Sequence, residues 1–300
     1  MLAGRDAPLV TVITPTYNRA AFLPETIDSV LRQDYPNIEY LVLDDGSSDD
    51  TAAVVGRYGD AVRYQRHDNM GETKTVNKGF ALASGDIVCV VNSDDPLYSD
   101  RAVSLAVASL AAHPGAGMAY PDWVSIDARG RVLRRMALPE YTLENMLESA
   151  DVTIGPGMFI RRSAIERIGP RNEAIKYTGD LDYSFRLAAC GEIVHIPEFL
   201  ATHREHSAAA SSTSQGAVMA GEVARLAHVY TDHPNTPAGI RKRRRHLLGK
   251  WHFVALGYTG KDRRAFREHA AKSFSYSPAL FCFFSVLRTL SLLKKRVFPG

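Results

Sequence analysis

The chain has 300 residues, of which 45% are hydrophobic and 23% charged, so it can bury the core of one large domain or of a domain with an extension. Its formal net charge of +3 is too small to indicate a nucleic-acid-binding protein. The three cysteines, Cys89, Cys190 and Cys282, are far apart and form no CxxC pair. This spacing excludes a disulfide framework or a zinc site and predicts buried thiols in a reducing compartment. No signal-peptide pattern precedes the first strand-like run, so we expect a cytoplasmic protein.

Short β-branched runs alternate with amphipathic helical patterns in the first half of the chain. The runs predicted as strands cover residues 9–14, 38–43, 61–65 and 86–92. The helical patterns between them cover residues 22–32, 51–58, 72–83 and 101–112. Strands that are apolar on both faces and alternate with helices indicate an α/β fold, in which helices cover both sides of a mostly parallel sheet.

The second half of the chain has a different pattern. Two short strand candidates within residues 118–138 flank a turn at 127–130, which predicts an inserted hairpin. A helix is predicted at 181–190, and from residue 215 onward the pattern is helical and increasingly basic. We therefore expect a catalytic domain at 1–214, with a nucleotide-binding half at 1–117 and an acceptor half at 118–214, followed by a helical extension at 215–300.

Polar residues follow three of the predicted strands where each strand ends. The three clusters are residues 14–19, 44–49 and 92–95. Because the carboxyl ends of parallel strands lie along one edge, where ligands of open α/β sheets bind, we expect the clusters to meet in one crevice. Each cluster alone also fits an ordinary turn or helix cap. Three clusters in phase favour a binding site.

The crevice lacks the usual glycine cradles for phosphate. No GxGxxG follows the first strand, and the stretch from Gly71 to Thr75 lacks the glycine that a P-loop has before Lys74. A diphosphate bound without such a cradle needs a cation. Mg²⁺ and Mn²⁺ typically take one or two carboxylates, with phosphates and water completing the shell. The acidic cluster at 92–95 suits this need.

Five motifs in order resemble those of the family 2 glycosyltransferases of the GT-A fold, bacterial members above all. They are VITPTYN at 12–18, LDDGS at 43–47, residues 69–79, NSDD at 92–95 and GDLD at 179–182, with a weaker match, REH, at 204–206. The resemblance spans residues 9–212. It implies an inverting transfer of a sugar, most often from a UDP-sugar, to a hydroxyl of a glycan or lipid-linked acceptor. The products would be cell-surface polysaccharide, lipopolysaccharide or glycolipid, and the cofactor Mn²⁺ or Mg²⁺.

The resemblance also implies roles for individual residues. The donor nucleotide-sugar would be bound by Thr14, Pro15, Tyr17, Asp44, Asp45, Asn69, Asn77, Asn92 and Asp94. The first three would line the base, Asp45 would accept a hydrogen bond from it, and Asn69 and Asn77 flank the segment that closes over ribose and diphosphate.

The metal would be held by Asp94, Asp95 and His206, with the division of work between the two acids left open. Asn92 stands where the family carries the first acid of its DxD motif, and Lys74 where relatives often carry an acid. His206 would contact the diphosphate or the metal, and a structural histidine is an equal alternative.

Asp180 begins the predicted helix at 181–190, where an N-cap is one reading. Asp182 lies four residues before Arg186, so we expect these two to pair and leave Asp180 free to face the crevice. The resemblance implies that Asp180 is the general base that deprotonates the acceptor hydroxyl. Gly155 to Phe159 and Trp123 are candidates for the acceptor side, and both also suit the core.

The C-terminal part is basic and then apolar. The basic run at 241–246 is most simply a solvated helix face. Nucleic-acid binding is not favoured, because no aromatic residues that could stack on bases are interleaved with it. Residues 279–293 are rich in Phe and Leu, contain Arg288 and are followed by Lys294, Lys295 and Arg296. This segment is too short to span a bilayer and suits a helix lying on an anionic membrane surface. Docking of the helix on the catalytic domain is the rival. We expect a location on the cytoplasmic face of a bacterial inner membrane.

Two other classes of function stay open at this point. One is a non-catalytic nucleotide-sugar-binding scaffold, against which the retained acids Asp45, Asp94, Asp95 and Asp180 argue. The other is a nucleotidyltransferase, which would need a glycine-rich, Arg-containing phosphate loop after the first strand. Turnover of a nucleotide-sugar to nucleoside diphosphate only when an acceptor is present would separate all three.

Overall fold

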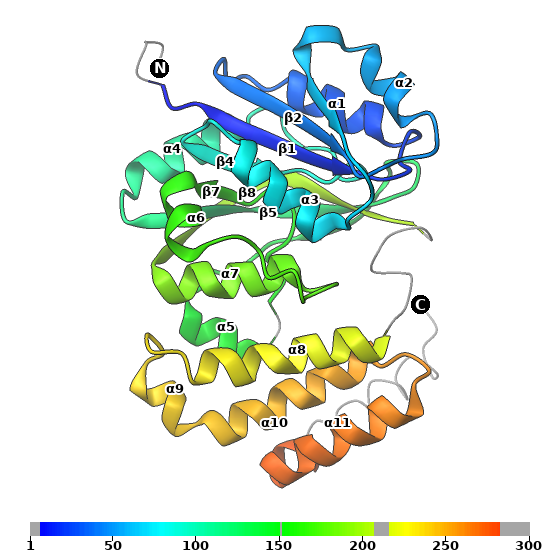
Figure 1. The fold of residues 1–300 in the computed structure, drawn as a ribbon. Coiled ribbons are helices and arrows are strands. Elements are labelled where there is room, and N and C mark those ends of the chain that lie inside the picture. The colour runs from blue at the N-terminus through cyan, green and yellow to red at the C-terminus, as the bar shows by residue number, and fades with distance from the viewer. Residues whose placement is uncertain (1–6, 151, 207–215, 283–300) are drawn as a thin grey trace. The chain divides into compact units, whose positions relative to one another are not determined.

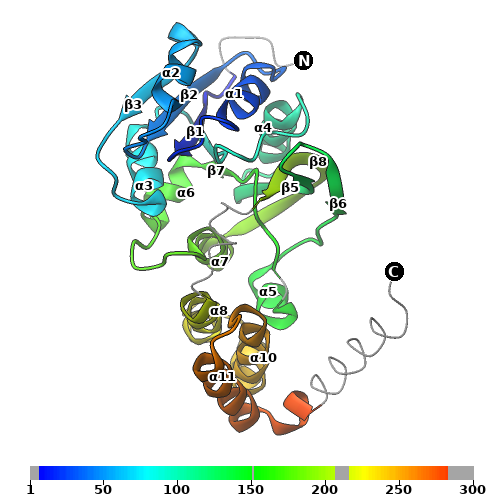
Figure 2. The same ribbon diagram turned by 90° about the vertical axis from the view of Figure 1, so that its right-hand side faces the viewer.

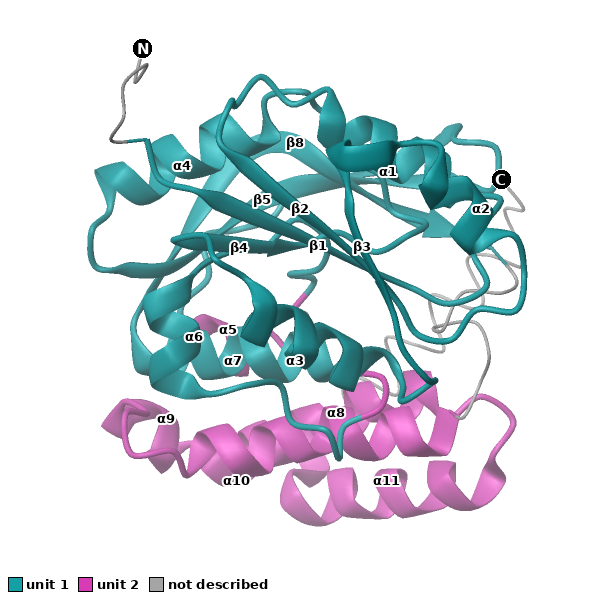
Figure 3. Cartoon of the chain, turned by 45° about the horizontal axis from the view of Figure 1, so that its top comes forward, with its two compact units in different colours: residues 1–142, 153–175, 179–212 teal, residues 143–152, 176–178, 213–300 magenta. Residues whose placement is uncertain are grey.

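The computed structural model describes residues 7–150, 152–206 and 216–282. The chain divides into two compact units, shown in different colours in Figure 3. The first unit comprises residues 1–142, 153–175 and 179–212, and the second comprises residues 143–152, 176–178 and 213–300.

A mixed eight-stranded sheet forms the centre of the first unit among the described residues. Its strands are β1 (Val10–Thr16), β2 (Ile38–Asp44), β3 (Arg63–Arg66), β4 (Ile87–Val90), β5 (Ala116–Asp127), β6 (Val132–Met136), β7 (Phe159–Arg161) and β8 (Glu192–Glu205). The order is β3-β2-β1-β4-β7-β5-β6, with β8 beside β5. The first four strands are mutually parallel, whereas β7 runs antiparallel to β4 and β5. The predicted α/β fold, its first four strands and the hairpin of β5 and β6 are confirmed.

Helices cover both faces of this sheet, as Figures 1 and 2 show. One face carries α1 (Leu23–Leu31), α2 (Thr51–Gly56) and α4 (Ala102–Ala112), and the other carries α3 (Glu72–Leu82), α6 (Arg162–Ile168) and α7 (Gly179–Cys190). Apolar residues of α1, α2 and α4 pack with alternate residues of β1, among them Val10 and Val12, in one buried cluster. This is the arrangement that strands with two apolar faces require.

Helix α3 lies unusually close to the sheet at Gly79. A Cβ there would stand 2.7 Å from Cγ2 of Ile13 and 3.1 Å from Cδ1 of Leu43, so only glycine permits this approach. The contact fixes the helix against β1 and β2. It thereby sets where the first residue of α3, Glu72, stands relative to the ends of these strands.

The sequence analysis did not predict β8. Its burial alternates irregularly, and its pairing with β5 contains register shifts, two of them around Asp122. A strand with Pro197 and no strict period-two pattern gives little local signal. It forms because β5 offers a long row of backbone partners, which is a tertiary effect.

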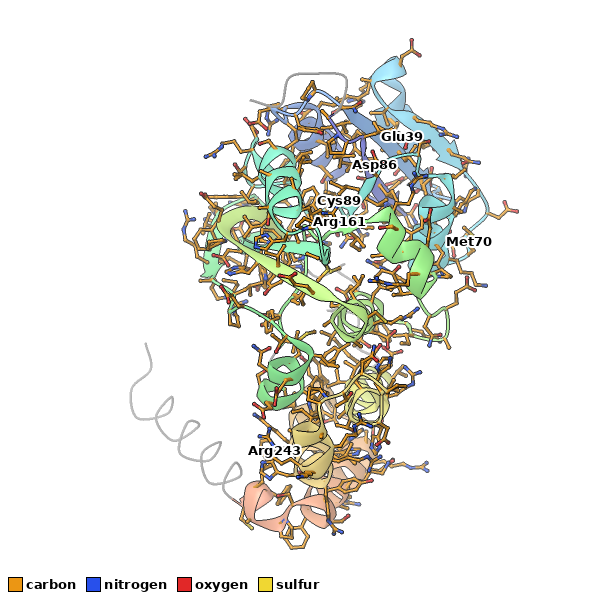
Figure 4. All side chains as sticks on the ribbon, turned by 90° about the vertical axis from the view of Figure 1, so that its left-hand side faces the viewer. Glu39, Met70, Asp86, Cys89, Arg161 and Arg243 are labelled. Carbon is orange, nitrogen blue, oxygen red and sulfur yellow. The ribbon has the colours of Figure 1, made fainter. Side chains whose placement is uncertain are left out.

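The predicted buried thiols are only partly present. Cys89 on β4 is buried, and burial raises the pKa of its thiol well above the usual range (Figure 4). Cys190 is half-buried. Cys282 is exposed, so for this residue the prediction is wrong. All three are free.

The second unit is helical. It contains α5 (Leu143–Ser149), α8 (Gly216–Thr231), α9 (Ala238–Lys242), α10 (Arg244–Ala255) and α11 (Arg263–Tyr276). Helices α8, α10 and α11 pack against one another. Trp251 on α10 is 1% exposed, and its indole N–H donates to the carbonyl oxygen of Leu147 on α5 at 2.8 Å. The predicted helical C-terminal part is confirmed for the described residues.

Two arginines of the basic run at 241–246 pair with acids inside this unit. Arg243, labelled in Figure 4, forms ion pairs with Glu144 and Glu148 of α5. Arg244 pairs with Asp232 at 2.7 Å, and Arg245 donates to the carbonyl oxygen of Ser275 at 2.7 Å. These arginines tie helices together, so the run is not simply a solvated face.

Three histidines form a chain within the same unit. Nε2 of His228 lies 3.2 Å from Nε2 of His252, and Nδ1 of His252 lies 2.9 Å from Nδ1 of His269. His228 and His269 face different ring nitrogens of His252, so the three rings cannot bind one metal ion in this arrangement. Burial, and then the charges of His269 and His228, lower the pKa of His252 from its ordinary 6.5 to about 3.

We expect the second unit to lose stability in mild acid. Below pH 6.5 the unfolded chain takes up a proton at His252, whereas the folded chain does not. The contribution of His252 to the free energy of unfolding is therefore fully present above pH 6.5 and is lost as the pH falls towards 3. At pH 5.5, one unit below the ordinary pKa, protonation of His252 in the unfolded chain would by itself lower the free energy of unfolding by about 1.4 kcal/mol. Urea unfolding at pH 7.5 and 5.5 measures this loss. A His252→Phe variant keeps a ring against Tyr276 and should be less acid-sensitive; equal losses in both proteins would contradict the assignment.

Candidate functional site

The three polar clusters meet at the carboxyl ends of β1, β2 and β4, as predicted. The backbone N–H of Asn18 donates to Oγ of Ser47 at 2.9 Å, and that of Ser48 donates to Oδ1 of Asn18 at 2.8 Å. Nε of Arg19 lies 3.1 Å from Oδ2 of Asp94, which links the first cluster to the third. Parallel pairing of β1 with both neighbours places these residues at one edge.

Asp44 is fully buried at the end of β2. Its carboxylate accepts hydrogen bonds from the backbone N–H of Ser47 at 2.8 Å and from the hydroxyl of Tyr64 at 2.5 Å. Burial and the neighbouring Asp44 carboxylate raise the pKa of that tyrosine. Asp44 therefore shapes the turn after β2, beneath the crevice.

Asp45 holds the loop that precedes α3. Its two carboxylate oxygens accept hydrogen bonds from the backbone N–H groups of Met70 at 2.7 Å and of Gly71 at 2.9 Å. Gly46 adopts a φ of +81°, and a Cβ there would stand 2.9 Å from the backbone nitrogen of Asn69. This close approach needs glycine. Asn69 itself is exposed beside it.

The residues expected to line the base differ in accessibility. Tyr17 is 48% exposed, so its ring is open to a ligand. Thr14 is fully buried, and its hydroxyl shares a hydrogen bond with that of Tyr40 at 3.1 Å. Pro15 is buried in β1. Of the three, only Tyr17 presents its side chain at the surface of the crevice.

The Asp94 carboxylate contacts side chains from two other segments of the chain. Its Oδ2 lies 3.1 Å from Nε of Arg19 and 3.0 Å from Nε2 of His206. Two of the three predicted metal ligands are thus side by side. The sequence analysis gave Arg19 no role, although its place at the end of the first cluster was the available signal.

Asp95, the third predicted ligand, is buried and already holds two protein donors. Its Oδ1 accepts from the backbone N–H of Arg204 at 2.7 Å, and its Oδ2 accepts from the amide of Asn92 at 3.2 Å. Asn92 therefore orients Asp95, a role that an acid at that position would not fill. The Asp95 carboxylate also raises the pKa of His203.

The metal-ligating side chains at this site can hold a divalent ion only if a bound diphosphate supplies further ligands. Among the described residues, no group of three or more His, Cys, Asp or Glu side chains is arranged to hold a metal. Asp94 and His206 offer one carboxylate and one imidazole. Mg²⁺ and Mn²⁺ often take no more than one or two protein carboxylates beside substrate phosphates and water. The pair is compatible with that mode of binding.

Arg204 fastens this cluster to its surroundings. The guanidinium is 1% exposed and donates to the carbonyl oxygen of Asp94 at 2.8 Å and to that of Asp127 at 3.2 Å. It also forms an ion pair with Glu25 at 2.5 Å. The ring of Phe22 lies beneath it and also packs against His206 at 4.8 Å. The arginine thus joins the end of β8 to α1 and β5.

Asp180 lies in the first turn of α7, which begins at Gly179. Among the described residues, its carboxylate accepts one hydrogen bond, from the backbone N–H of the next residue, Leu181, at 2.8 Å. An N-cap side chain would bond the N–H two or three residues on. Asp182 pairs with Arg186 at 3.1 Å, which confirms that prediction.

Asp180 and the acidic cluster belong to the same crevice. The start of α7 lies beside the first turn of α3, because a Cβ at Gly179 would stand 3.7 Å from the hydroxyl oxygen of Thr73. Desolvation, and then the negative charges of Asp180, Asp94 and Asp95, raise the pKa of Glu72, which adjoins Thr73 and has an exposed side chain. The positive charge of Arg171 opposes them. The charges of Asp180 and of the acidic pair Asp94 and Asp95 therefore act on the same carboxyl group, that of Glu72. The sequence analysis did not single out Glu72.

Asn77 positions the segment that leads to α7. Its side-chain amide accepts from the backbone N–H of Arg171 at 2.8 Å and donates to the carbonyl oxygen of the same residue at 3.0 Å. The amide is therefore committed to this loop. Asn77 links α3 to the approach of the helix that carries Asp180.

The two acceptor-side candidates are near each other in the fold. The indole N–H of half-buried Trp123 donates to the carbonyl oxygen of Thr153 at 3.0 Å. Gly157 has a φ of +79°, and a Cβ there would stand 2.8 Å from Cβ of Ala201. The glycine makes the turn into β7. Both residues have structural contacts, and Trp123 keeps part of its ring accessible.

A mostly parallel sheet with an acid-bearing strand end, followed by an antiparallel strand and a helix with an aspartate in its first turn, fits the GT-A fold. The family model of glycosyl transferase family 2 matches residues 11–169, and the chain belongs to this family. It is a glycosyltransferase.

The chain is also similar to a curated relative and, in fold, to solved structures. The O-antigen biosynthesis protein RfbC of Myxococcus xanthus is 29% identical over 270 residues, which are 85% of this chain and 21% of RfbC. The structure of S. aureus TarS 1–349 in complex with UDP-GlcNAc superposes with a TM-score of 0.71 at 19% identity, covering 91% of this chain and 82% of TarS 1–349. The mannosyltransferase PcManGT of Pyrobaculum calidifontis, in complex with GDP-Man and Mn²⁺, gives a TM-score of 0.64 at 18% identity, covering 97% and 81%.

Proposed function

We propose that the protein is an inverting glycosyltransferase that moves a sugar from a UDP-sugar to an acceptor hydroxyl. The observation that carries the proposal is the crevice in which Asp94 contacts Arg19 and His206, while the start of α7, with Asp180, lies beside the first turn of α3. The structure of TarS with UDP-GlcNAc supports the donor class. The likeness to an O-antigen biosynthesis protein supports a cell-surface glycan or a lipid-linked glycan as acceptor.

In this proposal Asp180 is the general base. It takes the proton of the acceptor hydroxyl while that oxygen attacks the anomeric carbon from the side opposite the diphosphate, which inverts the configuration. Base catalysis of this kind is worth about 10²–10⁴ in rate. Tyr17 would line the base of the nucleotide, and Asp45, which also holds the loop before α3, would accept a hydrogen bond from the base.

Asp94 and His206 would hold Mn²⁺ or Mg²⁺ together with the diphosphate. A bound ion supplies charge neutralisation for the leaving diphosphate. Arg19 contributes a second positive charge beside Asp94. The complex of PcManGT with GDP-Man and Mn²⁺ supports this cofactor class.

We expect UDP to stabilise the protein more with Mn²⁺ than with a chelator. At a ligand concentration of a hundred times Kd the gain is about 2.7 kcal/mol, or a rise in Tm of about 5–10 °C. Thermal-shift measurements with UDP, GDP and dTDP, each with Mn²⁺, Mg²⁺ or chelator, test donor and metal together.

An Asp94→Asn variant should lose the difference between metal and chelator, because it removes the carboxylate that faces His206. Asp86→Asn is the matched control, since Asp86 lies before β4, at the opposite end of that strand (Figure 4). Equal shifts with metal and with chelator in the unmodified protein would remove the metal from the proposal.

We also propose that the protein is peripheral on the cytoplasmic face of an inner membrane. Within the described parts of the chain, no helix has the length and apolar character needed to cross a bilayer. Most of the predicted membrane-surface helix at 279–293, and all of the basic residues at 294–296, lie outside the described residues.

A further inference from the structure

The outer face of α11 combines aromatic and basic side chains. Successive residues of an α-helix are rotated by about 100°. The helix buries Ala265, His269 and Ser273. One arc of the helix surface, which runs from Phe266 beside the buried stripe round to Ala271 opposite it, presents Arg263, Phe266, Arg267, Ala270, Ala271 and Phe274, and we call this arc the α11 face. Its two phenylalanines are 43% and 50% exposed. No acid stands on it.

The positive charges of the α11 face have no acidic partner within the described residues. Neither Arg263 nor Arg267 forms an ion pair there, in contrast to the arginines of the 241–246 run. The nearby acid Asp262 caps the helix by accepting from the backbone N–H groups of Arg264 and Ala265, each at 2.9 Å. The two arginines are thus available to an external anion.

A hollow adjoins the start of the α11 face. Its volume is about 600 Å³, and it is lined by Gly260, Lys261, Asp262, Arg263, Phe266 and Arg267. Three of these residues are cations, one is an acid and one carries an aromatic ring. The hollow therefore offers a net positive charge beside an apolar ring, which suits a lipid phosphate and the adjoining part of its acyl chains.

We propose that the α11 face docks on the surface of an anionic lipid bilayer. Phe266 and Phe274 would enter the boundary between headgroups and acyl chains, and Lys261, Arg263 and Arg267 would face lipid phosphates. Helices that lie on membranes use the same residue types, with Phe, Trp and Leu toward the acyl chains and Lys and Arg toward the headgroups. The inference rests on exposure and charge in α11 and does not depend on which sugar is transferred.

Flotation of the full-length protein with vesicles tests the inference. We expect the protein to float at low salt with vesicles of phosphatidylglycerol and phosphatidylcholine, and far less with phosphatidylcholine alone. The double variant Arg263→Glu/Arg267→Glu should weaken partition by roughly 30-fold, because each basic side chain near an anionic surface is worth about 1 kcal/mol. The double variant Phe266→Ser/Phe274→Ser should also lose flotation, and both should keep the Tm of the unmodified protein.

Two control variants carry matched changes off the α11 face. Lys272→Glu reverses the charge of an exposed side chain that lies about 180° around the helix from Arg263. Val218→Ser replaces an exposed apolar residue on α8. Both should float normally. Unchanged flotation of the α11 variants, equal loss in the controls, or a change in oligomeric state without any change in flotation would overturn the inference.

Discussion

Replacing Asp180 by asparagine should lower turnover by about a hundredfold or more while nucleotide affinity stays nearly unchanged. The amide keeps the size of the side chain and its bond to the N–H of Leu181, but it cannot take a proton from the acceptor. Steady-state rates of nucleoside diphosphate release with acceptor, together with a UDP titration, separate the two effects.

Asp182→Asn is the control on the same helix. Asp182 is 4% exposed and paired with Arg186, so its loss should lower the free energy of unfolding and leave the rate per folded molecule near normal. If Asp180→Asn keeps near-normal turnover, Asp180 serves the start of α7 and not the reaction. Binding of UDP would then still stand, because it depends on the other end of the crevice.

Replacing Arg204 by leucine should lower the free energy of unfolding by about 2–5 kcal/mol, since two carbonyl oxygens lose a charged donor and Glu25 loses its partner. The remaining Glu25 carboxylate is half-exposed, which keeps the cost below that of a fully buried charge. Urea unfolding of the full chain measures the difference. Because Arg204 also bonds the backbone at Asp94, UDP binding should weaken as well.

Arg134→Leu provides the comparison for this variant. Arg134 pairs with Glu205 at the neighbouring position of β8, but its side chain is 65% exposed. Surface ion pairs contribute about 0–1 kcal/mol. Similar losses for both variants would mean that the burial of Arg204 adds nothing and that the anchoring role assigned to it is wrong.

Much of the fold and the place of the crevice can be predicted from the sequence. The alternation of apolar runs with helical patterns defines β1 to β4 and α1 to α4, because burial on both faces leaves a clear local period. The crevice follows from one topological rule, that parallel strands end on the same edge. The pairing of Asp182 with Arg186 follows in the same way from a spacing of four on a helix.

The roles of single side chains at the crevice required the tertiary structure. Thr14 and Tyr17 stand in one motif, yet one is buried against Tyr40 and the other is exposed. Arg19, Glu72 and Arg204 gain their surroundings from segments far away in the chain. The strand β8 carries Arg204 and leads to His206, and it forms only because β5 is beside it.

The sequence by itself determined the class of fold, the edge of the sheet at which the site lies and the acids that line it, because these depend on periodicity and on residue type. The tertiary structure decided which groups each of those acids contacts. Asp44 and Asp95 accept hydrogen bonds from backbone N–H groups, whereas the Asp94 carboxylate meets the side chains of Arg19 and His206. The same holds for the basic C-terminal part, where internal acids bind Arg243 and Arg244 and leave the charges of α11 exposed. The physical reason is that a charge's partner is chosen by distance in space, and a local pattern carries no information about the segment that will supply it.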